Sequence, residues 1–274
     1  MTINCKGRLI DLTQPKVMGI LNITPDSFYD GGKHLDDKTI LSQTGKMLNE
    51  GATFIDVGAY SSRPGADYVS EDAELKRILP VVALLLREFP EIVLSIDTFR
   101  SAVAEPCLQI GAALINDISA GKLDGNMLSV VAEYQVPYIM MHMRGTPKTM
   151  QAQTDYKNLM VDILGYFAER IVQARHVGII DIILDPGFGF AKTLAQNYEL
   201  LAELQLLQNI NLPILAGLSR KSMIYKVLDT TPANALNGTT ALNMVALMNG
   251  ANILRVHDVK EAVACVALFK HLNS

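Results

Sequence analysis

The chain has 274 residues, a net charge of −4 and 49% hydrophobic residues, enough apolar material for a large α/β fold. This slightly acidic balance argues against a general nucleic-acid partner or an anionic membrane surface, and no apolar run is long enough to span a bilayer or direct secretion. The three cysteines, Cys5, Cys107 and Cys265, are widely spaced and odd in number, as expected in a reducing compartment such as the cytoplasm.

Short apolar runs alternate with helical patterns along the whole chain. A β-hairpin is predicted over 3–13, around the Lys6-Gly7 turn. The strands predicted after it cover 17–21, 53–57, 92–96, 113–115, 138–141, 182–184, 213–216 and 252–254. The predicted helices cover 36–50, 71–89, 101–110, 127–134, 156–177, 194–208, 222–249 and 259–272.

Eight strand–helix units in strict alternation predict an α/β fold, a (β/α)₈ TIM barrel with a short N-terminal β-hairpin. The structural alternative is a doubly wound open sheet, which would need a glycine-rich phosphate turn after the first strand. The sequence NITP at 22–25 is not such a turn. No tract typical of a linker divides the chain, so we expect residues 1–274 to form one domain.

The stretch IILDPGFGFAK at 182–192 shows most clearly how a strand could supply a site. An apolar strand runs into Asp185, and then proline and glycines end the strand and let a ligand approach the backbone. The other strands end in polar residues too, and barrel strands end at one mouth, where active sites lie. These strand-end residues are Asn22, Asp56, Asp97, Asn116, His142, Asp185, Ser219 with Lys221, and Arg255 with His257.

Taken singly, each of these residues is most simply a turn former or a helix cap. Together they predict a polar ligand, because burying so many polar groups without partners would be costly. Asp97, Asn116 and Asp185 suit a flat heterocycle that presents N–H donors. A second set suits a phosphate or pyrophosphate with a bound Mg²⁺ ion. The second set comprises Asn22, Lys221, Arg255 and His257.

Motifs in a fixed order make the chain resemble the dihydropteroate synthases, pterin-binding TIM-barrel enzymes of folate biosynthesis that sulfonamides target. The most specific motif is MGILNITPDSFYDGG at 18–32, and DVGAYSSRPG at 56–65 resembles the second signature of the family. The shorter matches are SIDT at 95–98, NDIS at 116–119, MHM at 141–143, DPGFGFAK at 185–192, GLSRKS at 217–222 and RVHD at 255–258.

The resemblance implies a transferase that joins 6-hydroxymethyl-7,8-dihydropterin pyrophosphate to p-aminobenzoate, giving 7,8-dihydropteroate and pyrophosphate. It implies Mg²⁺ as cofactor, with Asn22 at the metal position. It also implies a homodimer packed through the later helices. The apolar faces of 235–248 and 259–269 are compatible with such an interface.

The resemblance also assigns expected roles to individual residues. The residues expected to act in catalysis are Asp97, Asp185, Lys221, Arg255 and His257. The pterin positions are Asp97, Asn116, Asp185 and Lys221, and the pyrophosphate positions are Ser62, Arg255 and His257. The aminobenzoate region comprises Arg63, Pro64, Ser219 and Lys221, with Phe28 and Phe190 as apolar walls, and Met141 and Gly217 complete the expected substrate contacts.

This chemistry calls for a stabilised leaving group rather than a strong nucleophile. The cationic set would offset charge on the departing pyrophosphate, while the carboxylates favour a delocalised pterin cation. Loops 22–33 and 58–70 are expected to close over the reaction and exclude water. His142, which lies between two methionines, is expected to be a packed histidine rather than a metal ligand.

Two other functions remain open from the sequence. A methyltetrahydrofolate-binding methyltransferase domain would share the acidic pocket, but it would not need Asn22, Arg255 and His257. A pterin-binding paralogue without activity is also compatible, because the second loop reads AYSS at 59–62, where many family members have Gly-Glu-Ser-Thr.

Overall fold

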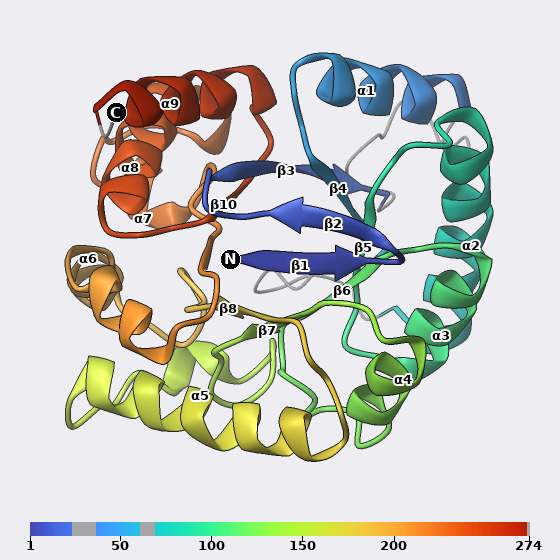
Figure 1. The fold of residues 1–274 in the computed structure, drawn as a ribbon. Coiled ribbons are helices and arrows are strands. Elements are labelled where there is room, and N and C mark those ends of the chain that lie inside the picture. The colour runs from blue at the N-terminus through green and yellow to red at the C-terminus, as the bar shows by residue number, and fades with distance from the viewer. Residues whose placement is uncertain (24–36, 61–68, 273–274) are drawn as a thin grey trace.

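Eight parallel strands surrounded by helices form the body of the molecule (Figure 1). The computed structural model describes residues 1–23, 37–60 and 69–272. The strands lie in the order β8-β7-β6-β5-β4-β3-β10-β9. Their bounds are β3 Lys16–Asn22, β4 Phe54–Gly58, β5 Leu94–Asp97, β6 Leu114–Asp117, β7 Tyr138–Met141, β8 Ile182–Asp185, β9 Leu215–Ala216 and β10 Ile253–Val256.

The sheet closes into a barrel where β8 meets β9. Only one bridge, between Leu184 and Ile214, joins these neighbours, and the Leu184 N–H donates to the Pro213 carbonyl at 2.8 Å. We call this junction the seam. The predicted (β/α)₈ barrel is therefore confirmed, and the polar carboxyl ends of all eight strands meet at one end, the mouth.

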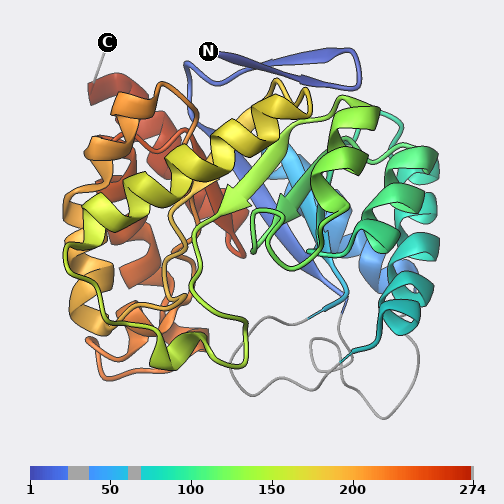
Figure 2. The same cartoon turned by 90° about the horizontal axis from the view of Figure 1, so that it is seen from below.

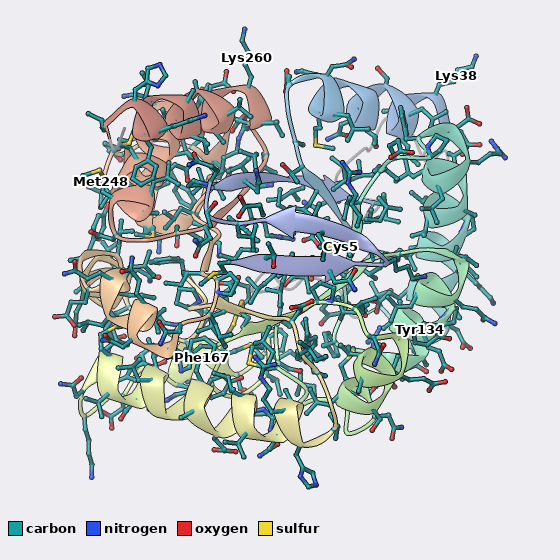
Figure 3. All side chains as sticks on the ribbon, viewed as in Figure 1. Cys5, Lys38, Tyr134, Phe167, Met248 and Lys260 are labelled. Atoms are coloured by element: carbon teal, nitrogen blue, oxygen red, sulfur yellow. The ribbon has the colours of Figure 1, made fainter. Side chains whose placement is uncertain are left out.

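The helices lie outside the strands in chain order. Their bounds are α1 Asp37–Asn49, α2 Glu71–Glu88, α3 Ser101–Ile110, α4 Met127–Tyr134, α5 Leu159–His176, α6 Leu194–Ala202, α7 Ser222–Tyr225, α8 Leu236–Met248 and α9 Val259–Leu272, with 3-10 turns η2 Met150–Ala152, η3 Leu204–Ile210 and η4 Pro232–Asn234. Large side chains such as Phe167 of α5 fill the layer between helices and strands, while Lys38 and Lys260 point outward (Figure 3). None of the described helices combines the length and apolar character that crossing a membrane requires.

The N-terminal hairpin closes the end of the barrel opposite the mouth (Figure 2). It pairs β1, Thr2–Cys5, with β2, Arg8–Asp11, through a turn in which Lys6 and Gly7 both have positive φ. Such a turn matches the twist of two paired strands, so the predicted hairpin is confirmed. We call the buried cluster at this end the floor. Its members are Ile3, Cys5, Ile10, Leu12, Met18, Phe54, Val93, Ala113, Leu114, Ile139, Ile183, Leu215 and Ile253.

Three of the predicted helices differ from the structure by more than one residue at an end or are divided. The helix predicted over 156–177 begins at Leu159, because the Asn158 side chain accepts the Val161 N–H and caps its first turn. The helix predicted over 194–208 ends at Ala202 and continues as the 3-10 turn η3. The stretch 222–249 is divided into α7, η4 and α8, because Asp229 has a positive φ and Pro232 starts a new turn.

Candidate active site

The alternation of side chains along each strand decides which strand-end residues face the barrel axis. Neighbouring residues point to opposite faces, so a residue two positions after a floor residue faces inward at the mouth. Among the residues that meet this condition, six belong to the candidate site: Asp56, Asn116, Met141, Asp185, Gly217 and Arg255. All but Asp56 are among the substrate contacts expected from the sequence, so the fold brings these residues to one place.

Arg255 links two strands across the interior of the barrel. Its Nε lies 2.6 Å from Asp56 Oδ2, and its Nη2 lies 2.6 Å from Asp97 Oδ2. Asn116 Nδ2 donates to the same Asp56 oxygen at 2.9 Å. The second oxygen, Asp56 Oδ1, is buried and makes no hydrogen bond within the described chain. The guanidinium is thus fixed by two carboxylates from neighbouring strands, with an amide beside them.

Asp97 occupies a position where burial competes with an ion pair. Burial raises the pKa of Asp97 to about 7; Arg255 opposes this rise and the negative charge of Asp56 adds to it. Gly58 leaves the room for this carboxyl, because a Cβ at Gly58 would lie 3.3 Å from Asp97 Cβ. A carboxyl whose pKa is near neutrality at a barrel mouth is a candidate for a functional group.

A second carboxylate–cation pair lies across the mouth, at the seam. Burial raises the pKa of Asp185, and the charge of Lys221 opposes the rise. Burial lowers the pKa of Lys221 to about 8, and Asp185 opposes that shift in turn. Lys221 Nζ donates to the carbonyl of Phe188 and lies 4.9 Å from the centre of the Phe190 ring. This cation therefore connects the turn after β8 with the turn after β9.

Two further polar residues lie side by side at the ends of β9 and β10. Ser219 Oγ is 2.9 Å from His257 Nδ1, and the His257 N–H donates to Ser219 Oγ at 3.2 Å. The next residue, Arg220, has a positive φ and forms a two-point ion pair with Asp258. That pair fixes the β9 turn, so Ser219 and His257 form a unit beside Arg255.

An apolar patch forms another wall of the mouth. Met141 packs in one cluster with Ile118, Met143, Met150 and Ala191, and the rings of Phe99 and Phe190 contact this cluster. The predicted apolar contacts Met141 and Phe190 therefore lie together. A flat aromatic ligand would find a hydrophobic face on this side and hydrogen-bonding groups on the other.

Asn22 ends β3, next to Gly58 in the paired strand. No hydrogen bond of its side chain is present within residues 1–23, 37–60 and 69–272, so its amide oxygen has no protein partner there. Mg²⁺ favours oxygen ligands and commonly keeps one or two from protein while phosphates and water supply the rest. Asn22 therefore fits a Mg²⁺ ion that a diphosphate carries into the mouth. No group of three or more acidic, histidine or cysteine ligands occurs in the described chain.

Four of the residues expected to contact substrate lie outside the described residues: Phe28, Ser62, Arg63 and Pro64. The departure from the family pattern is partly described. Ala59 is buried and is not among the residues with positive φ, so alanine causes no backbone strain there. Tyr60 packs edge-on against Phe99, with the Arg100 guanidinium 5.3 Å from the Tyr60 ring. Tyr60, which stands where many family members have Glu, thus contacts an aromatic ring and a guanidinium.

The structure adds residues that the site expected from sequence lacks. Asp56 was named only as a strand end, yet it holds Arg255; an acid inside the apolar run FIDVG was the available signal. Lys192 ends the motif DPGFGFAK and has no expected role, yet it is buried within hydrogen-bonding distance of His142. His142 is packed as predicted, edge-on to Tyr166 at 4.8 Å. Its ring points toward α5, so it does not share the axis-facing set.

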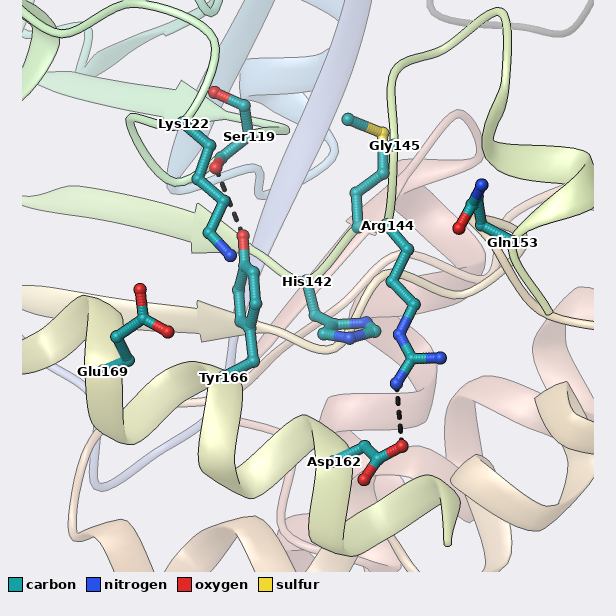
Figure 4. Close-up of a pocket in the computed structure, with 10 residues that line it drawn as sticks. Ser119, Lys122, His142, Arg144, Gly145, Gln153, Asp162, Tyr166 and Glu169 are labelled. Atoms are coloured by element: carbon teal, nitrogen blue, oxygen red, sulfur yellow. Dashed lines mark hydrogen bonds and ion pairs between the residues drawn. The ribbon is translucent and has the colours of Figure 1, made fainter. Parts of the chain in front are cut away.

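A separate cavity of about 390 Å³ lies outside the barrel, beside α5 (Figure 4). His142 and Arg144 come from the end of β7, and Asp162 and Tyr166 come from α5. Arg144 forms an ion pair with Asp162 at 2.7 Å, and the Tyr166 hydroxyl donates to the carbonyls of Ser119 and Met141. These side chains of the cavity wall therefore interact with other protein groups. The axis-facing groups lie on the other side of β7.

Comparison with known proteins agrees with this geometry. A model of a family described as pterin binding enzymes matches residues 18–257. A dihydropteroate synthase of Escherichia coli is 45% identical over 265 residues, covering 96% of this chain and 93% of that protein. The Yersinia pestis dihydropteroate synthase, solved with a sulfonamide drug, has a TM-score of 0.94 at 44% identity and covers 100% of this chain and 99% of its own. The Xanthomonas albilineans enzyme, solved with 4-aminobenzoic acid, has a TM-score of 0.93 at 36% identity and covers 100% and 98%. The chain belongs to the dihydropteroate synthase family of pterin-binding enzymes.

Proposed function

We propose that the axis-facing residues divide the dihydropteroate synthase reaction between pterin binding and release of pyrophosphate. The reaction is a transfer: the methylene carbon of a dihydropterin pyrophosphate leaves its diphosphate oxygen and bonds to the amine nitrogen of p-aminobenzoate. The observation that carries the assignment of residues is the position of Arg255, which contacts both Asp56 and Asp97 at the barrel mouth.

Asp97, Asn116 and Asp185 bind the pterin ring in this proposal. Carboxylates accept from the N–H groups of a pterin, and a carboxamide can both donate and accept. The Asp185 carboxylate is already oriented, because its Oδ1 accepts the Gly187 N–H at 2.8 Å. Met141 supplies an apolar surface for one face of the ring. These residues would set the plane in which the reacting methylene carbon lies.

Arg255, His257 and Asn22 act on the diphosphate. As the carbon–oxygen bond breaks, the electron pair goes to the leaving oxygen, and fixed cationic donors stabilise that charge. Ser219 orients His257 through the contact between its Oγ and Nδ1. A Mg²⁺ ion at Asn22 would neutralise part of the diphosphate charge. Ser62, which lies outside the described residues, belongs to this group by its place in the motif.

The charge of the mouth favours the cation that remains after pyrophosphate departs. The ionisable groups described at the mouth include the carboxylates Asp56, Asp97 and Asp185 beside the cations Lys221 and Arg255. The carboxylates stabilise a positive charge delocalised over the pterin. Because these groups are fixed before the substrate arrives, little reorganisation is needed at the moment of reaction.

The aryl amine attacks from the side of the mouth that Lys221, Ser219 and Phe190 form. Lys221 and Ser219 offer donors for a carboxylate, and the Phe190 ring offers a face for the benzene ring. Arg63, Pro64 and Phe28 would complete this region, although they lie outside the described residues. The 4-aminobenzoic acid bound in the Xanthomonas albilineans structure is consistent with the substrate class.

A coupled assay of pyrophosphate release, run with and without p-aminobenzoate, tests this proposal. A synthase releases pyrophosphate only when p-aminobenzoate is present, and Arg255→Met should reduce the release about 1000-fold. Arg87→Met is the matched control, because Arg87 is an exposed arginine of α2 that pairs with Glu88 away from the mouth. Absence of release by the wild-type enzyme would favour the paralogue without activity. Equal release by Arg255→Met and wild type would contradict the residue assignment.

We further propose that the chain acts as a homodimer in the cytoplasm and folds as one domain. Exposed apolar side chains on the last two helices support the dimer: Val245 and Met248 on α8, and Leu268 and Leu272 on α9. The three cysteines are buried and free, as suits a reducing compartment. Sedimentation of the purified enzyme should give twice the chain mass, and Leu268→Asp should shift it toward the monomer.

A further inference from the structure

Lys192 lies behind the turn that follows β8, with almost its whole side chain buried. The residue is 5% exposed, and its ammonium is surrounded by three acceptors. His142 Nδ1 and the carbonyl of Gly187 are each 3.0 Å from Nζ, and the carbonyl of Phe190 is 3.1 Å away. An ammonium has three protons and no acceptor site, so three acceptors satisfy it completely. No substrate contact of the proposed reaction involves this group.

The acceptors come from two different strand-end turns. His142 follows β7, while Gly187 and Phe190 belong to the turn over 185–192. The same turn carries Asp185 at its start and the Phe190 ring near its end, and the carbonyl of Phe188 accepts from Lys221. Whatever fixes this turn therefore fixes pterin-binding and aminobenzoate-binding groups together.

The first part of the turn packs so closely on His142 that it has no room for a side chain at Gly187. Gly187 has a φ of +72°, and a Cβ there would lie 2.2 Å from the His142 carbonyl oxygen. The Gly187 N–H bonds to Asp185, and the Gly189 N–H donates to Asn197 Oδ1 at 2.6 Å. The later part of the turn is held by Lys192 itself, through Phe190.

We propose that Lys192 is a positioning residue of the synthase, which clamps the turn 185–192 onto His142 and so presents Asp185 and Phe190 to the two substrates. The proposal rests on the proposed function for its kinetic part. His142 takes part as a neutral acceptor whose ring packs against Tyr166. Neither residue touches a reacting atom; both act through the turn.

The electrostatic surroundings agree with this assignment. Burial lowers the pKa of Lys192 to about 7; Asp185 opposes that shift, and Lys221 and Arg144 add to it. The three acceptors favour the charged form, since a neutral amine has only two protons to donate. Burial, with Lys192 as the nearest cation, lowers the pKa of His142, which keeps Nδ1 free to accept.

Three variants separate a clamp from a general effect on folding. Lys192→Met keeps the aliphatic stem and removes the ammonium. His142→Phe keeps the packed ring and removes the acceptor, while His142→Asn retains an acceptor near the position of Nδ1. The matched control is Lys260→Met, because Lys260 is an exposed lysine at the start of α9.

The first measurement is amide hydrogen exchange of the turn. We expect the N–H groups of Gly187, Gly189 and Phe190 to exchange at least 10-fold faster in Lys192→Met and in His142→Phe than in wild type, with wild-type rates in Lys260→Met. Unchanged exchange in both clamp variants would overturn the proposal. This readout does not require activity, so it decides the clamp even where the wild-type protein releases no pyrophosphate. Should Lys192→Met fail to fold, His142→Phe gives the same test.

The second measurement is steady-state kinetics. We expect Lys192→Met to raise the KM for both substrates about 10- to 100-fold, because displacement of positioned groups weakens binding and reaction together. His142→Asn should restore most of what His142→Phe loses. The double variant Lys192→Met with His142→Phe should be no worse than Lys192→Met alone, since that substitution already removes the contact with His142. Wild-type KM values with only a lower kcat, or additive losses in the double variant, would show a merely structural role.

Discussion

The two ends of the barrel are built from the same strands and have opposite chemistry. At the floor, the axis-facing residues are apolar, and the hairpin β1–β2 covers them. At the mouth, two residues further along four of these strands, they are Asp56, Asn116, Asp185 and Arg255. The floor gains free energy from burial, while the mouth buries charges that depend on nearby ion pairs and hydrogen bonds. Stability and reactivity are therefore separated along one axis, which can be tested by changing each end alone.

The largest effect should come from Asp185→Asn at the mouth. The substitution keeps the size of the side chain but removes the charge that interacts with Lys221 and that, in the proposed mechanism, stabilises the pterin cation. We expect kcat/KM to fall about 1000-fold, which is about 4 kcal/mol of transition-state stabilisation. The unfolding temperature, measured by calorimetry, should stay at the wild-type value or rise. A large loss of stability with normal kcat/KM would reverse the contrast between the two ends.

A smaller and opposite effect should come from Ile3→Ala at the floor. Ile3 is 2% exposed and packs in the cluster that seals the barrel. Removal of a buried aliphatic side chain should lower the free energy of unfolding by about 2–3 kcal/mol, measured by urea denaturation. KM values for both substrates should remain unchanged, because no axis-facing polar group moves. A raised KM would mean that the floor and the mouth are mechanically coupled.

The smallest effect should appear in the pH dependence of stability. Burial raises the pKa of Asp97 in the folded protein to about 7, above the ordinary value of 3.8. The folded state therefore binds this proton more tightly than the unfolded state, and the associated stability is lost as pH rises through about 7. The carboxyl is 21% exposed and paired with Arg255, so we expect a change of about 1 kcal/mol.

Comparison of Asp97→Asn with wild type isolates this contribution. The free energy of unfolding of the variant, relative to wild type, should increase between pH 5 and pH 8. Lys192, whose pKa shift has no contribution from Asp97, titrates in both proteins and cancels in the difference. A difference that stays flat over this range would show that Asp97 titrates with an ordinary pKa.

The barrel itself follows from the sequence, because strand-length apolar runs and helical patterns have different periods and alternate along the chain. Helix ends were harder to predict, since a single side chain such as Asn158 decides where the first turn begins. For 222–249 the sequence predicts only that helical material fills the stretch, without the points at which one helix ends and the next begins. Backbone conformation at Asp229 and the new turn at Pro232 interrupt it, and neither leaves a strong periodic signal.

The axis-facing set was largely predictable once the barrel was predicted, because the carboxyl ends of all its parallel strands lie at the same end of the barrel. Pairing between strands was not predictable, because it depends on distances between residues such as Asp56 and Arg255, which are 199 positions apart. The role of Lys192 was hidden, since a lysine at the start of a helix is ordinarily exposed and only the fold reveals its burial. The pairing of Asp56 with Arg255 and the burial of Lys192 both depend on which side chains come into contact in the fold. The presence of polar residues at the strand ends could be recognised in the sequence.

The seam has a consequence for how the enzyme responds to heat. A single bridge at Leu184 joins β8 to β9, whereas the other neighbouring strands share longer registers. In a closed sheet, local opening should begin at the junction where the two strands share the fewest paired residues. Phe188 and Lys221 lie on opposite sides of it and are joined by a hydrogen bond across it. Warming should therefore weaken the binding of both substrates at temperatures well below the unfolding temperature of the chain. Thermal inactivation and thermal unfolding would then be two separate events.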